Sequence, residues 1–246
     1  MRKIITSLMA VALAVSVFAA SPTSRESMRR GEEFFSAGKF NEARRELVGV
    51  VDDHSLTPAE RQRVECYIAL CAIELGEEQA AVLLDNYLSK YPHSVYDNEI
   101  RFAAACMAYK QGDYQTALDR FAAVRRIEDA RRDEYEFKAG HAKFAVGRTE
   151  EAYEQLARVA AKSEYAPHAC YYRSYIDYSQ GRLDSAKAGF RSIESEEAYS
   201  ALVPFYLLQI EFQQANYRYV VENCDALIAR STPARRAEIE RTAAES

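Results

Sequence analysis

The chain contains no tryptophan, no Cys-x-x-Cys pair and, beyond its first twenty residues, no apolar run long enough to cross a bilayer. Without Cys-x-x-Cys, neither a zinc ribbon nor a thioredoxin-like redox pair has support. The net charge is −5 and no strongly basic stripe is present, which argues against nucleic acid as the main partner because phosphates are bound by clustered lysine and arginine. Glycine and proline are also scarce, so the position of each is informative.

Patterns that carry catalysis are missing as well. The four histidines, His54, His93, His141 and His168, show no ligand spacing with one another or with cysteine, so we expect no metal site. No Ser-His-Asp or Cys-His arrangement is recognisable, and no glutamate lies in a recognisable catalytic motif. The sequence therefore predicts a protein that is not an enzyme and needs no cofactor.

The first twenty residues form a separate segment. Arg2 and Lys3 precede an apolar stretch from Ile4 to Ala20 that ends in small residues, which is typical of a secretory signal peptide over residues 1–20. A membrane-spanning helix is the alternative, but the uninterrupted apolar part is short for a span of roughly 20 residues. No cysteine follows the cleavage region. We therefore expect a periplasmic protein that is not a lipoprotein and has no integral span after cleavage.

Cysteine usage leaves two interpretations open. The five cysteines lie among alanines, aromatics and other apolar residues: Cys66, Cys71, Cys106, Cys170 and Cys224. The favoured interpretation is small buried thiols. The alternative is a disulfide, which an oxidising compartment permits, with Cys71 and Cys106 as the pair to check.

A turn pattern recurs along nearly the whole chain. Its anchor residues are spaced 38, 36, 35, 34 and 34 residues apart, which indicates a stack of repeated units. These anchors are Gly38, Gly76, Gly112, Gly147, Gly181 and Ala215. Each glycine tolerates a backbone conformation that other residues resist, so the chain can reverse direction there. The unit is therefore two helices joined by a tight turn.

Apolar spacing supports this unit. In the third unit we expect one helix from Glu99 to Gln111 and a second from Tyr114 to Arg126, each with apolar residues at i, i+3, i+4 and i+7. The prolines after the leader fall between repeats or in the first turn of a helix, where a missing N–H is tolerated. No alternation typical of strands competes. The sequence therefore predicts an all-α solenoid.

At this point the chain resembles the tetratricopeptide repeat proteins. The residues that carry the resemblance are Gly31, Phe34, Gly38, Phe40, Ala43 and Leu47 in the first repeat, and Ala105, Gly112, Tyr114, Ala117 and Phe121 in the third. Gly140, Gly147, Ala152 and Leu156 repeat the pattern in the fourth. The family's tryptophan is absent, Glu78 replaces the aromatic after the second turn, and Val220 replaces the alanine of the sixth repeat.

The resemblance implies a right-handed α-α superhelix of about six helical hairpins plus a trailing helix. It covers residues 25–230, with repeats at about 25–57, 58–93, 94–130, 131–164, 165–198 and 199–231. Residues 232–246 then form either a capping helix or the first helix of a further repeat, and we favour a further repeat, in a longer protein. The segment 87–94 is similar to repeats of bacterial envelope proteins that serve outer-membrane assembly or coordinate cell-wall machinery.

In this family the first helices of the hairpins line the concave face. The resemblance therefore implies a partner-binding groove lined by aromatic residues of those helices: Phe102, Tyr109, Phe137, His141, Phe144, Tyr171, Tyr175, Tyr178, Phe205 and Phe212. The alternative is that these rings pack between neighbouring helices. Because Tyr171 and Tyr172 are adjacent, we do not expect both to point into one core. The charged runs at 125–132 and 194–197 are interpreted as solvated helix ends and loops, or alternatively as charged contact points for a partner.

We therefore expect a scaffold that binds another protein or peptide segment in this groove. Two alternatives remain open at this stage. The chain is either an accessory solenoid of a larger cell-wall hydrolase, whose catalysis would lie beyond residue 246, or a glycan-binding module, since aromatic rings stack well on sugars.

Overall fold

The computed structural model describes residues 22–246, and these residues form thirteen α-helices, one short 3-10 helix and no strand. The all-α prediction is therefore confirmed for this part of the chain. The predicted signal peptide, residues 1–20, lies outside the described residues. The chain divides into two compact units, one ending at Ile100 and one beginning at Arg101. Helix α5 (Asp97–Lys110) contributes to both.

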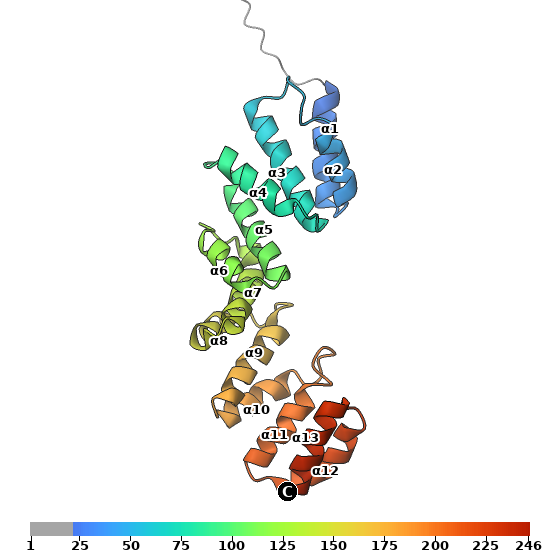
Figure 1. Ribbon diagram of the computed structural model, residues 1–246, viewed down its shortest axis with the longest axis vertical. Helices are drawn as coiled ribbons and strands as arrows, with labels where there is room; N and C mark the ends of the chain where they lie inside the picture. The colour runs from blue at the N-terminus through green and yellow to red at the C-terminus, as the bar shows by residue number, and fades with distance from the viewer. Residues whose placement is uncertain (1–21) are drawn as a thin grey trace, which may run out of the picture. The chain divides into compact units, whose positions relative to one another are not determined.

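The first unit contains two helical hairpins. Its complete helices are α1 (Pro22–Ser36), α2 (Phe40–Val48), α3 (Pro58–Glu74) and α4 (Ala80–Lys90). Helix α2 packs on α1, α3 packs on both, and α4 packs on α3 (Figure 1). Thr57 begins α3 with a capping box, because its hydroxyl accepts the N–H of Glu60 while the Glu60 carboxylate accepts the N–H of Thr57. The core of this unit forms around Leu47, Val64 and Ile68.

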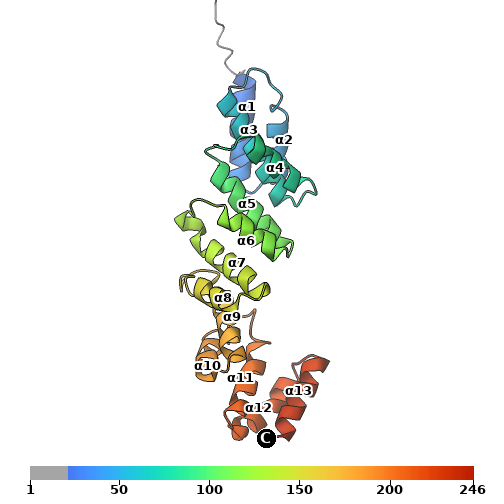
Figure 2. The ribbon, with the colours of Figure 1, turned by 60° about the vertical axis from the view of Figure 1, so that its left-hand side comes forward.

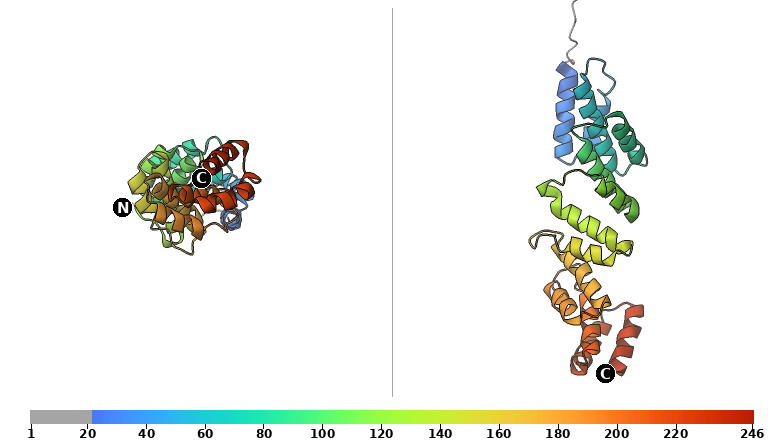
Figure 3. Two further views of the ribbon diagram at one scale, coloured as in Figure 1. Left: turned by 90° about the horizontal axis from the view of Figure 1, so that it is seen from below. Right: turned by 90° about the vertical axis from the view of Figure 1, so that its left-hand side faces the viewer.

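The second unit continues the same alternation of helices. After α5 it contains α6 (Tyr114–Ala122), η1 (Asp129–Arg131), α7 (Arg132–Ala145), α8 (Thr149–Leu156), α9 (Ala166–Ser179), α10 (Leu183–Ser192), α11 (Val203–Gln213), α12 (Tyr217–Ile228) and α13 (Pro233–Ala244). Each of the hairpins α7–α8, α9–α10 and α11–α12 packs on the helix that follows it (Figure 2). Helix α7 also contacts α9, and α11 contacts α13. In the right-hand view of Figure 3 these helices follow one another in chain order, from yellow-green to red.

Helix α6 ends four residues earlier than the sequence pattern indicated. The predicted second helix of the third unit reached Arg126, whereas the observed helix stops at Ala122. Val124 and Ile127 of the following segment instead pack against the cluster of Phe102, Ala117 and Phe121. The apolar residues that extended the helical pattern are thus used by a loop that covers the same core.

Every hairpin reverses through the same arrangement of backbone hydrogen bonds. At the third turn, the N–H of Gly112 donates to the carbonyl of Tyr109, and the N–H of Asp113 donates to the carbonyl of Ala108. The same two bonds recur at the other five turns. This is the Schellman motif, in which a residue with positive φ ends the helix. The five turn glycines have φ between 67° and 81°.

Ala215 occupies this position in the sixth turn. Its φ is 59°, and it is the one residue other than glycine with positive φ in the described part of the chain. A Cβ atom in this region crowds the following carbonyl, at a cost of roughly 1–2 kcal/mol. The last turn is therefore closed by the same hydrogen bonds as the others but carries backbone strain that they do not.

Small residues allow the two helices of a hairpin to approach closely. A Cβ on Gly140 of α7 would lie 2.7 Å from Cγ of Leu156 in α8, and a Cβ on Gly31 of α1 would lie 2.7 Å from Cγ of Leu47 in α2. Ala152 and Ala186, in the second helices of their hairpins, are fully buried. Contacts at this distance leave no space for a larger side chain.

None of the five cysteines forms a disulfide within the described residues. Cys66, Cys71 and Cys224 are buried, and Cys106 and Cys170 are half-buried. Burial raises the pKa of Cys71 and of Cys106 to about 11, so both thiols stay protonated near neutral pH. The structure therefore favours the interpretation of these two residues as packed thiols.

The strain at Ala215 gives the first prediction. Ala215→Gly should raise the free energy of unfolding by roughly 0.5–1 kcal/mol, because it relieves the positive φ and loses part of that gain to glycine's greater freedom in the unfolded chain. Gly181→Ala should lower it by about 1 kcal/mol, since it introduces the same strain. Urea unfolding followed by circular dichroism measures both. A lower midpoint for Ala215→Gly would show that the sixth turn is not strained.

The second prediction concerns helix approach, and α10 offers a matched pair of alanines two residues apart. Ala186→Leu should lower the free energy of unfolding by about 1–3 kcal/mol, because the fully buried site has no space for a larger side chain. Ala188→Leu, on the exposed side of the same helix, should change it by less than about 0.5 kcal/mol. Equal urea midpoints for the two variants would contradict the assigned packing face.

Candidate partner-binding surface

Aromatic side chains of the second unit form a continuous set of ring contacts. We call this set the aromatic surface, and it consists of Tyr109, Phe137, His141, Phe144, Tyr165, His168, Tyr172 and Tyr175. All eight side chains are half-buried, so each combines a packed edge with an accessible one. The surface is built mainly on two neighbouring first helices, α7 and α9, which contact each other directly.

Helical spacing explains why these rings share a face. Phe137, His141 and Phe144 follow one another by four and three residues along α7, and the α9 rings continue from Tyr165 at intervals of three, four and three. Residues three and four apart lie on one side of an α-helix. The facing stripes of α7 and α9 therefore meet along their length.

His141 lies at the centre of the contacts. Its ring is nearly parallel to that of Phe137, with centroids 6.0 Å apart and an interplanar angle of 7°. Tyr172 approaches to 4.5 Å between centroids, and the Tyr109 hydroxyl lies 2.7 Å from Nδ1 of His141. Burial lowers the pKa of His141, which favours the neutral imidazole. The imidazole is thus held by one hydrogen bond and by rings on several sides.

A second histidine is fixed in a similar way at the start of α9. His168 contacts Phe137, with 5.6 Å between centroids, and its Nδ1 lies 2.6 Å from the hydroxyl of Tyr199. Tyr199 is buried, and this burial raises its pKa to about 12. Phe137 is therefore flanked by two imidazoles, each restrained by a tyrosine from another segment. Such restraint limits the rotamers available to the rings before any partner binds.

Tyr171 and Tyr172 point to different clusters, although they also touch each other. Tyr172 belongs to the aromatic surface, whereas Tyr171 stacks on Tyr199 at 4.9 Å and contacts Phe190 of the α10–α11 core. Burial raises the pKa of Tyr171. Tyr178 also packs against this core, through Tyr206, and its hydroxyl accepts a hydrogen bond from Gln213 at 3.1 Å.

Three of the ten residues predicted to line the groove lie elsewhere. Phe102 and Phe205 are 3% and 9% exposed, and their rings are part of the core, so they offer little area to a partner. Phe212 is half-buried, but its one ring contact is with Tyr217, away from the aromatic surface. Tyr109, Phe137, His141, Phe144 and Tyr175 lie together. Tyr171 and Tyr178 pack against the α10–α11 core, which Tyr175 also contacts through Tyr206.

Sequence reasoning missed three members of the aromatic surface, Tyr165, His168 and Tyr172. A usable signal was present, because these residues and Tyr175 continue a spacing of three and four that begins one residue before α9. The spacing was obscured by Tyr171 and Tyr178, which are also aromatic and pack against the α10–α11 core. Tyr199, which restrains His168, comes from the loop before α11, and no local pattern connects the two.

Residues 22–246 contain no cluster of histidine, cysteine or carboxylate side chains suited to hold a metal ion. In the same range, no helix combines the length and the apolar character needed to cross a bilayer. Lys138 and Glu134 form an ion pair beside the aromatic surface, with 2.5 Å between Nζ and Oε1. The Lys138 ammonium also lies 5.8 Å from the centre of the Tyr109 ring.

Comparison with known proteins identifies the architecture. No family model and no curated protein matches the chain. Among solved structures, MamA (MSR-1 C2) is 16% identical, covering 72% of this chain and 98% of that one, with a TM-score of 0.56. A tetratricopeptide repeat protein from Parabacteroides merdae is 15% identical, covering 89% and 86%, with a TM-score of 0.59. A kinesin light chain with TPR-like repeats from Podospora anserina is 16% identical, covering 73% and 98%, with a TM-score of 0.53.

The chain has the tetratricopeptide repeat fold. At these identities the likeness concerns the fold alone. Within this fold, α7 and α9 are first helices of their repeats, and the aromatic surface lies where these two meet. The tetratricopeptide repeat fold therefore accounts for the spacing of the two aromatic stripes, while the identity of their residues is particular to this chain.

The burial of His141 gives a prediction for pH dependence. Its pKa is lower in the folded chain than in the unfolded one, so the unfolded chain binds more protons as the pH falls. The stability that comes from neutral His141 is therefore complete above the unfolded pKa of about 6.5 and is lost as the pH falls below it. His141→Gln should flatten the dependence of the free energy of unfolding between pH 7 and pH 5. An unchanged slope in urea titrations would mean that the fold does not lower the pKa of His141.

Proposed function

We propose that the chain is an exported, non-enzymatic scaffold that binds a segment of a partner protein on the aromatic surface. The observation that carries the proposal is the continuous set of half-buried rings across α7 and α9. Tyrosine and phenylalanine are enriched at the buried cores of protein interfaces, because they contribute large contact areas with few rotatable bonds. In a fold made of stacked hairpins, such a surface has no need of a deep pocket.

The hydroxyl groups support a peptide rather than a purely apolar ligand. No described residue forms a hydrogen bond with the hydroxyls of Tyr165, Tyr172 or Tyr175. Each of these tyrosines therefore combines an apolar ring with a free donor and acceptor. A peptide segment offers both apolar side chains and backbone N–H and C=O groups, which match that combination.

We further propose that the protein works in the periplasm, in outer-membrane or cell-wall assembly. Support comes from the signal-peptide pattern of residues 1–20 and from the similarity of residues 87–94 to envelope proteins of that kind. A periplasmic scaffold would bring proteins together without chemistry of its own. This agrees with the lack of a catalytic motif in the sequence.

Glycan binding is the second candidate. One observation favours it, namely that the rings of Phe137 and Tyr165 stack with 5.4 Å between centroids and 23° between planes, while His141 is nearly parallel to Phe137. Near-parallel aromatic faces suit the flat faces of sugar rings. We rank this candidate second because the charged side chains beside the rings, Lys138 and Glu134, already pair with each other. For the accessory solenoid of a cell-wall hydrolase, no described residue supplies a specific observation.

A peptide library tests the proposal. Random peptides displayed on phage should select for apolar and aromatic sequences when the mature chain is the bait. Tyr172→Ala should then weaken binding of the selected peptides roughly five- to thirtyfold, because truncation of a central aromatic anchor typically costs about 1–2 kcal/mol. Calorimetry measures the affinity, and circular dichroism should show retained helical content.

Tyr217→Ala is the matched control, since Tyr217 is an exposed tyrosine of the same unit outside the aromatic surface. Its variant should bind the selected peptides like the wild type. If both variants bind equally well, the aromatic surface is not the binding site. Saturable binding on a glycan array that Tyr172→Ala abolishes, with no peptide selected, would instead establish the second candidate.

A further inference from the structure

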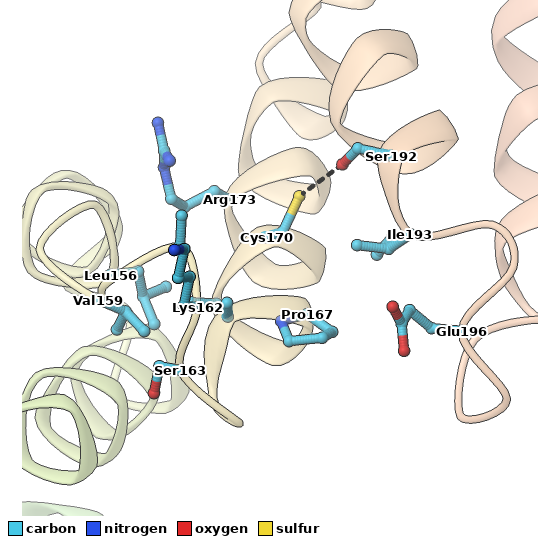
Figure 4. A pocket seen from close by; sticks show the side chains of 13 residues that line it. Leu156, Val159, Lys162, Ser163, Pro167, Cys170, Arg173, Ser192, Ile193 and Glu196 are labelled. Atoms are coloured by element: carbon cyan, nitrogen blue, oxygen red, sulfur yellow. Dashed lines mark hydrogen bonds between the residues drawn. The ribbon is translucent and has the colours of Figure 1, made fainter.

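A cleft of about 490 Å³ opens on another side of α9. It is lined by the end of α8, the loop from α8 to α9, the first half of α9 and the segment that follows α10 (Figure 4). Leu156, Pro167 and Ile193 give it an apolar floor, and Lys162, Arg173 and Glu196 contribute charge. The volume lies within the range of pockets that enclose small ligands or a few side chains.

This cleft is separate from the aromatic surface. Ala169 and Arg173, four residues apart on α9, line the cleft. His168 and Tyr172, which each precede one of them, belong to the aromatic surface. Because successive residues of an α-helix are turned by about 100°, the two pairs face different directions. One helix therefore presents two chemically distinct surfaces.

Some buried carboxylates elsewhere in this unit form ion pairs, whereas the charges of the cleft, of which Lys162 and Glu196 are exposed, form none with described residues. Glu211 pairs with Lys187 at 2.6 Å, and Asp177 pairs with Arg182 at 2.6 Å. By contrast, no described carboxylate forms an ion pair with Lys162 or Arg173, and no described cation pairs with Glu196. Unpaired charges of both signs in one cleft are available to an outside ligand.

The Arg173 side chain is held in place by Tyr153, but no described carboxylate neutralises its charge. Its guanidinium lies 4.8 Å from the ring centre of Tyr153, and its side chain donates a hydrogen bond to the Tyr153 hydroxyl at 3.4 Å. Its Nε is buried and has no hydrogen-bond acceptor among the described residues. A restrained cation without an acidic partner favours binding of a carboxylate.

The two signs of charge lie at opposite sides of the cleft. Figure 4 shows Lys162 and Arg173 on one side of Pro167, and Glu196 on the other side near Ile193. The apolar floor lies between them. A ligand that complements this arrangement has an anionic group at one end, a cationic group at the other and an apolar part in the middle.

We propose that this cleft is a second binding site, for a short peptide segment in which an acidic and a basic side chain flank small apolar residues. A peptide supplies such a pattern with backbone groups that the hydroxyls of Ser163 and Ser192 are able to bind. The site acts beside the aromatic surface and does not depend on the function proposed for it. A partner chain that engages both would gain affinity through linked binding.

Three capped and amidated heptapeptides with the same Ala-Pro-Val centre test the proposal. One carries aspartate and lysine at its ends, one carries two aspartates, and one carries two lysines. Binding is measured by fluorescence anisotropy at low salt. The wild type should prefer the mixed peptide over both others by roughly threefold or more, and 0.5 M NaCl should reduce that preference, because exposed charges are screened.

Glu196→Lys should transfer the preference to the peptide with two aspartates, since the cleft then carries cations at both sides. Glu197→Lys is the matched control, because it makes the same change in net charge at the exposed neighbouring residue, which does not line the cleft. The control should keep the wild-type preference, and so should Tyr172→Ala. Equal binding of the three peptides to the wild type, no binding at all, or the same behaviour of Glu196→Lys and Glu197→Lys would overturn the proposal.

Discussion

The positive φ at the end of each first helix is the constraint on which the architecture depends. At each turn, two backbone hydrogen bonds close the helix and redirect the chain into the second helix of the hairpin. Because the reversal takes so few residues, the second helix must lie against the first, and at Gly31 and Gly140 the approach leaves no space for a Cβ. The turn at Ala215 shows that the hydrogen bonds form even without glycine, so the fold tolerates local strain at one repeat.

This constraint also determines which faces remain for binding. One side of each helix is used for its hairpin partner, and the first helices α7 and α9 also contact each other along a second, half-buried stripe. On α7 and α9 that stripe is aromatic, and the rings satisfy one another through contacts and two histidine–tyrosine hydrogen bonds. The surface is therefore ordered by its own contacts. Because the rings are already ordered, less conformational entropy is lost when a partner binds.

The sequence was sufficient for the fold because the turn signal is local. Gly112, Gly147 and Gly181 each lie where the backbone has a positive φ. The alanines that follow them lie where two helices pack too closely for a larger side chain. The membership of the aromatic surface was harder to predict, because an aromatic residue at helical spacing looks the same whether it faces a core or solvent. Phe102 and Phe205 are buried, whereas Tyr172 is not, and the difference depends on contacts with loops and helices from neighbouring repeats. The pairing of His168 with Tyr199 spans 31 residues and has no sequence pattern of its own.

The charged cleft is a second feature that could not be predicted from the sequence. The run at 194–197 admitted two interpretations, a solvated loop or charged contact points, and composition alone did not distinguish them. Placement separates its members, because Glu196 lines a cleft opposite Lys162 and Arg173 while Glu197 does not. Glu196 and Glu197 thus carry the same charge and are adjacent in the sequence, but the α10–α11 loop places only Glu196 in the cleft. In a repeat fold, the packing of the helices fixes the spacing of the binding surfaces. The conformations of the loops between repeats then determine which charged side chains line those surfaces.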